Sequence, residues 1–120
     1  MTTQHDHTTA DLAGSSFHLI GVGGAGMSVL AQLLAEQGAH VTGSDAHSSP
    51  ALEQLLAQGL EVRVGHDADA VPPEATVVVS TAIKETNPEL VRARGRGQEV
   101  IHRSQALALA ARGRSMVAVA

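Results

Sequence analysis

A short pattern that occurs three times constrains the fold of this chain more than any other feature. Segments 38–41, 59–62 and 97–100 each have the form Gly-x-x-Val, follow a helix-like stretch and precede a short apolar run. A helix that ends at a glycine in the left-handed conformation, and then turns tightly into a strand, accounts for this pattern. We therefore expect helices and strands to alternate, which is typical of a parallel sheet with helices on both faces.

Apolar runs and turn residues give the approximate bounds of these elements. The expected strands are 17–21, 40–44, 61–64, 76–80 and 99–101. The expected helices are 27–37, 51–58, 89–96 and 104–112. Ser49 and Asn87 precede prolines and are therefore expected to be N-caps. The prolines within 71–74 predict a short, irregular connection between the third and fourth strands. The fold class is thus α/β, a Rossmann-like three-layer domain with about five parallel strands.

The expected domain comprises residues 16–113. Residues 1–15 are polar, lack the apolar stretch of a signal peptide, and are expected to form a disordered leader. The last residues, 115–120, are apolar and are expected to form a buried strand. A parallel strand normally leads into a functional loop at its carboxyl end, and no loop follows here. We therefore expect 114–120 to lead into a further domain of a larger protein.

Composition excludes several classes of function. The formal net charge of −4 argues against a nucleic-acid partner, as does the presence of a single aromatic residue, Phe17. The chain has no cysteine, and its histidines match no zinc-binding spacing, so no metal site is expected. No apolar run is long enough to cross a membrane, and the expected location is the cytoplasm.

A glycine-rich turn follows the first expected strand. Gly21, Gly23 and Gly26 fit the pattern G-x-G-x-x-G, between a predicted strand and a predicted helix. Glycines permit close approach of the backbone, and the amide groups at the start of a helix attract phosphate. The turn is therefore a candidate phosphate-binding site, although a tight turn that serves packing alone would have the same sequence.

Polar residues follow the other expected strands, and in a parallel sheet these strand ends meet at one edge. They are Ser44, Asp45, His66, Ser80, Thr81 and Arg103. Any one of them could simply cap a buried strand, but their coincidence beside the glycine-rich turn indicates a site. Asp45 comes nineteen residues after Gly26, where dinucleotide-binding folds place the acid that holds the ribose of NAD. An NAD-binding dehydrogenase domain is therefore the alternative, and a regulatory ligand-binding module is a third possibility.

Several motifs in order resemble the first domain of the Mur ligases. They are HLIGVGGAGMS at 18–28, GSD at 43–45, SP at 49–50, GH at 65–66, STAI at 80–83, NPE at 87–89 and VIHRS at 100–104. The resemblance covers residues 16–120 and is greatest for the alanine-adding members. A related ligase that recycles murein peptides shares the domain but has a less similar glycine turn. In the family, the segment VAVA runs directly into an ATP-binding loop, which would explain the expected strand at 115–120.

The resemblance implies a function and a set of site residues. Alanine-adding members join L-alanine to UDP-N-acetylmuramate in peptidoglycan synthesis, using ATP and magnesium, and their first domain holds the UDP group. This chain alone is therefore expected to have no catalytic activity and to bind neither ATP nor magnesium. The expected partners are UDP-N-acetylmuramate and the remaining ligase domains. The implied UDP-binding residues are Gly21, Gly23, Gly24, Ala25, Gly26, Met27, Ser28, Ser44, Asp45, His66, Ser80, Thr81, Ala82, Ile83 and Arg103. Thr81 and His102 stand where the family often has serine and proline.

Overall fold

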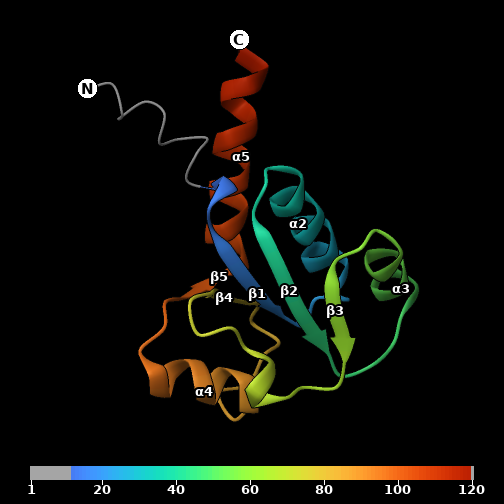
Figure 1. The fold of residues 1–120 in the computed structure, drawn as a ribbon, viewed down its shortest axis with the longest axis vertical. Helices are drawn as coiled ribbons and strands as arrows, with labels where there is room; N and C mark the ends of the chain where they lie inside the picture. The colour runs from blue at the N-terminus through green and yellow to red at the C-terminus, as the bar shows by residue number, and fades with distance from the viewer. Residues whose placement is uncertain (1–11, 120) are drawn as a thin grey trace.

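The computed structural model describes residues 12–119 and consists of alternating strands and helices (Figure 1). The strands are β1 (Ser16–Ile20), β2 (His40–Asp45), β3 (Glu61–Val64), β4 (Thr76–Val79) and β5 (Val100–His102). The helices are α2 (Ala25–Glu36), α3 (Pro50–Ala57), α4 (Pro88–Arg96) and α5 (Arg103–Val119), and a short 3-10 turn, η1 (Ala68–Ala70), connects β3 to β4. The α/β class, the five expected strands and the short third connection are therefore confirmed.

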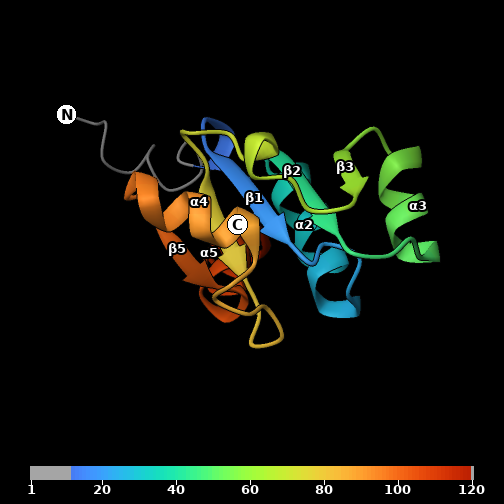
Figure 2. The same cartoon turned by 90° about the horizontal axis from the view of Figure 1, so that it is seen from below.

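All five strands are parallel, in the order β3-β2-β1-β4-β5. The chain first builds outward from β1 to β3 and then returns to the other side of β1 to add β4 and β5. Figure 2 shows the result, with α3 beyond β3 at one end of the row and α4 toward β5 at the other. The direction changes between β1 and β4, and open α/β sheets bind ligands at the carboxyl ends of strands beside such a point.

The helix ends that generate the repeated pattern have one geometry. At the end of α2, Gly38 has a φ of 92° and the N–H of Ala39 donates to the carbonyl of Leu34 at 3.1 Å. The same bond pattern with a glycine at positive φ ends α3 at Gly59 and α4 at Gly97. This is the Schellman geometry, which only glycine adopts at low cost. The repeat in the sequence is therefore the signature of three equivalent turns from helix into strand.

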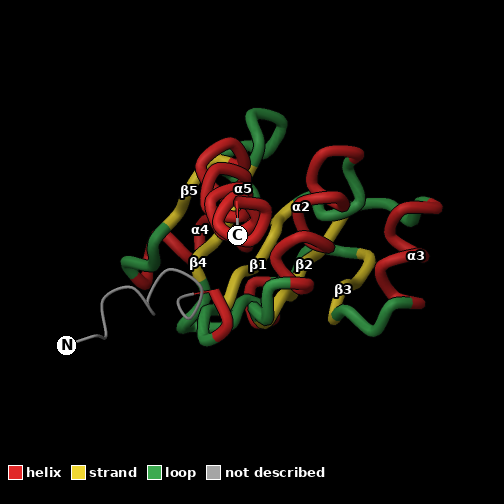
Figure 3. Tube along the Cα trace, turned by 90° about the horizontal axis from the view of Figure 1, so that it is seen from above, coloured by secondary structure: helices red, strands yellow, loops and turns green. Residues whose placement is uncertain are grey.

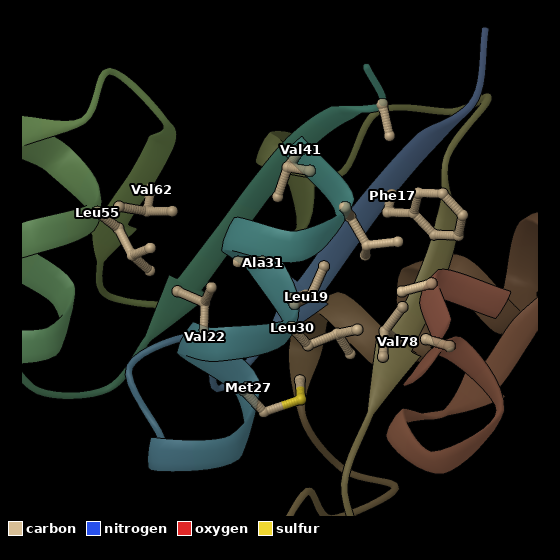
Figure 4. Packing of buried hydrophobic residues seen from close by; sticks show 14 of the residues in the cluster. Phe17, Leu19, Val22, Met27, Leu30, Ala31, Val41, Leu55, Val62 and Val78 are labelled. Atoms are coloured by element: carbon tan, nitrogen blue, oxygen red, sulfur yellow. The ribbon is translucent and has the colours of Figure 1, made fainter. Parts of the chain in front are cut away.

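The core lies on both faces of the sheet because side chains alternate along each strand. Helices α2 and α5 lie side by side on one face (Figure 3). Figure 4 shows the packing there, where Leu19 and Val78 from the sheet meet Leu30 of α2. Helix α4 covers the other face, on which Ile20, Val71, Val77, Leu90 and Ala93 form a smaller cluster. No helix among the described residues is long and apolar enough to span a membrane.

The C-terminal segment differs from the expectation. Residues 115–119 were predicted to form a strand, but they continue helix α5, which runs from Arg103 to Val119. Ala120 lies outside the described residues. A strand needs a neighbour to satisfy its backbone N–H and C=O groups, whereas a helix satisfies them within the segment. Because α5 is also rich in alanine, the strongest helix former, the segment continues the helix and pairs with neither edge strand of the sheet, β3 or β5.

The start of the described chain also differs from the expectation. Residues 1–11 lie outside the described residues, but Leu12 is buried in the main core. The carbonyl of Ser15 accepts a hydrogen bond from the N–H of His40 at 2.9 Å, which holds the entry to β1 against β2. Residues 12–15 are therefore part of the domain, and the prediction of disorder over 1–15 was wrong for these four.

Candidate functional site

The glycine-rich turn leaves the carboxyl end of β1 and is fixed to the neighbouring strand β2. The carbonyl of Ser44 accepts hydrogen bonds from the N–H groups of Gly21 at 2.7 Å and Val22 at 2.9 Å. Gly21 has a φ of 85°, a conformation that side chains other than glycine rarely adopt. The turn then closes on itself, because the N–H of Gly24 donates to the carbonyl of Gly21. These hydrogen bonds thus fix the backbone of the turn.

Helix α2 starts at this turn with unsatisfied donors. Gly24 is its N-cap and supplies no side chain to the first-turn amides. The N–H groups of Ala25, Gly26 and Met27 have no acceptor within the helix, as is general for a first turn. Arg103, the first residue of α5, lies beside them: a Cβ added to Gly26 would be only 3.0 Å from its Nη1. Backbone donors and a guanidinium therefore converge at one place, an arrangement that suits a phosphate.

Asp45, at the end of β2, occupies part of this surface. Its Oδ2 accepts a hydrogen bond from the N–H of Gly23 at 2.9 Å, and its Oδ1 accepts one from the N–H of His47 at 3.2 Å. A Cβ added to Gly23 would lie 3.0 Å from both Asp45 Oδ2 and Ser49 Oγ. The glycine is thus required for close contact between the turn and the end of β2.

The segment after β4 approaches the turn from the other side of the switch point. Its chain bends at Ser80, whose carbonyl accepts from the N–H of Ile83 and whose hydroxyl accepts from the N–H of Ala82. The side chain of Ile83 reaches the turn, since a Cβ added to Gly21 would lie 3.2 Å from its Cδ1. Thr81 and Ala82 are exposed. The segment that follows β4 therefore borders the glycine-rich turn at Gly21.

Three of the predicted site residues are buried, Met27, Ser28 and Ser44, and the first two point away from the turn. Met27 packs in the main core, and the hydroxyl of Ser28 donates to the carbonyl of Ala25 at 3.1 Å. The group of Met27 that remains available to a ligand is therefore its backbone N–H, in the first turn of α2. The structure thus brings together the turn, Ser44, Asp45, His66, Ile83 and Arg103, and it places the side chains of Met27 and Ser28 behind them.

A buried polar cluster, formed by His18, Thr42, Ser44 and Glu89, lies directly below this edge. His18 and Thr42 are register partners on β1 and β2, so their side chains share the face that α4 covers. His18 Nδ1 lies 2.7 Å from Thr42 Oγ1, and His18 Nε2 lies 2.7 Å from Glu89 Oε1. The hydroxyl of Ser44 donates to the same Oε1 at 2.6 Å. Residues from β1, β2 and α4 are therefore joined through one carboxylate.

Glu89 is fully buried, and its other oxygen is also satisfied. Oε2 accepts from the N–H of Asp67 at 2.8 Å and lies 3.8 Å from His66 Nδ1. Burial opposes ionisation, but the hydrogen bonds from His18, Ser44 and Asp67 outweigh it and lower the pKa of Glu89 below its ordinary value. The cluster reaches the site through His66, whose Nδ1 is 2.9 Å from Ser44 Oγ.

This cluster was not predicted from the sequence. Residues 87–89 have the pattern of a helix start, for which an acid in the first turn is ordinary and normally exposed. Asn87 is indeed the N-cap and accepts from the N–H of Glu89 at 2.9 Å. The available signal was His18: a polar residue inside a strand that is buried on both faces needs a polar partner. Within residues 12–119, no group of three or more His, Asp or Glu side chains could hold a metal ion.

Known proteins share this arrangement of sequence and fold. A model of the Mur ligase family, described as its catalytic domain, matches residues 16–115. The UDP-N-acetylmuramate–L-alanine ligase of Kineococcus radiotolerans is 50% identical over 106 residues, which cover 86% of this chain. The ligase of the same name from Rubrobacter xylanophilus is 53% identical over 100 residues, which cover 82% of this chain. In both cases the match spans 22% of the relative's own length.

Solved structures agree with these matches. The UDP-N-acetylmuramate-alanine ligase of Thermotoga maritima superposes with a TM-score of 0.75 at 30% identity, over 78% of this chain and 22% of that protein. The UDP-N-acetylmuramate:L-alanyl-gamma-D-glutamyl-meso-diaminopimelate ligase of Neisseria meningitides superposes with a TM-score of 0.67 at 31% identity, over 75% of this chain and 29% of that protein. Because the family match extends over most of the chain and includes the whole described site, the chain belongs to the Mur ligase family.

Proposed function

We propose that this chain is the UDP-binding part of a ligase that joins L-alanine to UDP-N-acetylmuramate. The observation that carries the proposal is the start of α2, where free amide groups and Arg103 meet at the switch point of the sheet. The curated relatives named for this reaction, at 50% and 53% identity, support the choice of ligand. They also weigh against the NAD-binding alternative.

In this proposal, the diphosphate lies at the start of α2. The amides of Ala25, Gly26 and Met27 donate to its oxygens, and the guanidinium of Arg103 supplies positive charge. Each charge-assisted bond of this kind contributes about 1.5–3 kcal/mol when it is sheltered from water. Gly23 has no role as a free donor here, because its N–H is already bound by Asp45.

The uridine would lie along the strand ends, between the end of β2 and the segment that follows β4. Asp45 and His66 offer hydrogen-bond acceptors for hydroxyl or N–H groups of the nucleoside. The segment 80–83 supplies a wall, with Ile83 as its apolar contact. Carboxylate and phosphate repel each other, so Asp45 is better suited to the ribose or the base than to the diphosphate.

The remaining chemistry is proposed to belong to other parts of the ligase. The only lysine of the chain, Lys84, lies outside the glycine-rich turn, and residues 12–119 hold no cluster of metal-binding side chains. We therefore assign no catalytic step to these residues and propose that ATP and magnesium bind to other parts of the ligase. We propose that residues 16–113 are the nucleotide-binding domain and that the chain continues beyond 114–120 into an ATPase domain. Such a ligase would act in the cytoplasm, where ATP and UDP-linked precursors are available.

Titration calorimetry with four ligands tests this proposal. UDP-N-acetylmuramate and UDP should bind to the chain with dissociation constants on the order of micromolar to millimolar, because contacts from further domains are missing. ADP has the same diphosphate with another base and should bind more weakly than UDP. Binding of NAD that is tighter than binding of UDP would overturn the proposal and favour the dehydrogenase alternative.

A further inference from the structure

The hydrogen bonds of the buried cluster determine where its protons lie. Ionised Glu89 can only accept hydrogen bonds, so the hydroxyl proton of Ser44 points to Glu89 Oε1, 2.6 Å away. That hydroxyl has one proton and cannot also donate to His66. The 2.9 Å contact between Ser44 Oγ and His66 Nδ1 therefore requires the proton to be on Nδ1. Neutral His66 is then the Nδ1–H tautomer.

His18 has the opposite tautomer, with its proton on Nε2. Its Nε2 lies 2.7 Å from Glu89 Oε1, so Nε2 must carry a proton. Thr42 Oγ1 is 2.7 Å from His18 Nδ1 but 3.5 Å from the carbonyl of Phe17, so its proton goes to the ring nitrogen. The two histidines of the cluster therefore provide an internal comparison, with protons on different nitrogens.

We propose that Glu89 is a positioning residue that acts through Ser44 to hold His66 as the Nδ1–H tautomer, so that Nε2 of His66 is a hydrogen-bond acceptor for the ligand. The ring of His66 is partly exposed, and its Nε2 has no hydrogen-bond partner among the described residues. An acceptor at this position would select a ligand with an O–H or N–H donor, such as a nucleoside. The tautomer concerns the protein alone, whereas its role in binding depends on the proposed function.

The variant Glu89→Gln gives a sharp prediction. The backbone N–H of Asp67 needs an acceptor, so the amide oxygen of glutamine should occupy the position of Oε2. The amide NH₂ then occupies the position of Oε1 and donates to both Ser44 Oγ and His18 Nε2. Ser44 in turn donates to His66 Nδ1, which moves the proton of His66 to Nε2. Both histidines should therefore change tautomer, although the shape of the side chain is almost unchanged.

Nitrogen NMR of the histidine rings, recorded without ligand at a pH where the rings are neutral, measures these tautomers directly. We expect His66 as Nδ1–H and His18 as Nε2–H in the unmodified chain, and the reverse in Glu89→Gln. The matched control is Thr42→Val, which removes the partner of His18 Nδ1 and should leave His66 as Nδ1–H. Detection of His66 as Nε2–H in the unmodified chain, or as Nδ1–H in Glu89→Gln, would overturn the proposal.

A second variant keeps the test decisive if Glu89→Gln fails to fold. Ser44→Ala removes the hydroxyl between Glu89 and His66 but retains the carbonyl that binds the glycine turn. His66 should then lose its preference for the Nδ1–H form, while His18 should keep the Nε2–H form. A His66 that remains Nδ1–H in Ser44→Ala contradicts the proposed path from Glu89.

Ligand titration separates this inference from the proposed function. In Glu89→Gln, UDP should bind about tenfold more weakly, because an acceptor at His66 has become a donor. Pyrophosphate has no nucleoside donor and should bind equally to both forms. If UDP does not bind to the unmodified chain, the proposed function fails while the tautomer result stands. If UDP binds and Glu89→Gln weakens UDP and pyrophosphate equally, the positioning role fails.

Discussion

The carboxylate of Asp45 binds the backbone N–H of Gly23 at 2.9 Å and thereby joins the end of β2 to the middle of the glycine-rich turn. In the usual phosphate-binding interpretation of such a turn, every amide is available to the ligand. Here the amides of Gly21, Val22 and Gly24 already donate to backbone carbonyls, and the amide of Gly23 donates to Asp45. A negative charge also lies beside the proposed phosphate position. We propose that Asp45 contacts the nucleoside and that the start of α2 contacts the diphosphate, and substitutions can test these two roles separately.

Asp45→Ala should weaken the binding of UDP and leave the binding of pyrophosphate unchanged or stronger. The loss for UDP should be about 1.5–3 kcal/mol, the usual effect of removing a charged acceptor. Pyrophosphate gains the free N–H of Gly23 and loses a repulsive charge. Calorimetric titration of both ligands measures the difference. Glu74→Ala, which removes an exposed acid before β4, changes the net charge equally and should affect neither ligand. Equal losses for both ligands would assign Asp45 a purely structural role.

Gly23→Ala should reduce UDP binding about tenfold, because the new methyl group displaces the Asp45 carboxylate, whose oxygen would lie 3.0 Å from it. Gly95→Ala is the matched control. Gly95 lies in α4, and a Cβ there meets nothing within 4 Å. This control should leave UDP binding intact and increase the free energy of unfolding by about 0.5–1 kcal/mol. Unchanged UDP binding in folded Gly23→Ala would show that the ligand lies elsewhere.

Gly43→Ala should destabilise the fold by about 1–3 kcal/mol, as overpacking in a core generally does. A Cβ at Gly43 would lie 2.8 Å from Val22 Cβ and 2.9 Å from the carbonyl oxygen of Leu19. Both neighbours belong to the strand and turn that begin the site, so neither moves without a shift of the backbone. Chemical denaturation provides the measurement. A midpoint equal to that of the unmodified chain would show that β1 and β2 are not in such close contact.

The stability of the domain should depend on pH through Glu89. Its pKa in the folded state lies below the ordinary value of 4.5. Folding therefore favours the ionised form, and the resulting stabilisation is complete above about pH 4.5 and decreases as the pH falls through the lower folded pKa. The titratable side chains that face Glu89 are His18 and His66. Unfolding free energies measured from neutral pH down to pH 3 should show this decrease.

Glu89→Gln should flatten part of that decrease and lower the stability at neutral pH by about 1–3 kcal/mol. The pKa of Glu85 is also lowered, by its hydrogen bond with Arg94, and it contributes in the same pH range. Glu85→Gln is therefore the control, and it should retain the part of the pH dependence that belongs to Glu89. An identical acid profile in Glu89→Gln and the unmodified chain would show that Glu89 does not titrate as described.

The strands and helix ends could be predicted from the sequence because their causes are local. The glycines at 38, 59 and 97 end helices through their own backbone conformation, and Ser49 caps α3 by accepting from the N–H of Leu52 at 3.1 Å. Such signals need only a few neighbouring residues. The helical conformation of 115–119 was missed because an apolar run of that length fits either a helix or a strand.

The candidate site was predicted only in part, because its support is not local. The carboxyl ends of parallel strands must meet, so the association of the turn with Ser44, Asp45 and His66 could be expected. The partners of Glu89, by contrast, come from β1, β2 and the segment after β3, up to 71 residues away in sequence. No periodic pattern encodes such a cluster, and only the packing of α4 onto the sheet brings its members together.

An amide NMR titration tests the central claim, that UDP binds at the glycine-rich turn, more directly than any other measurement. Addition of UDP-N-acetylmuramate should shift the amide resonances of Gly21, Gly24 and Gly26 and of segment 80–83, and NAD at the same concentration should shift them less. Shifts of these resonances by NAD and not by the UDP ligand, or shifts confined to residues away from the turn, would contradict the account.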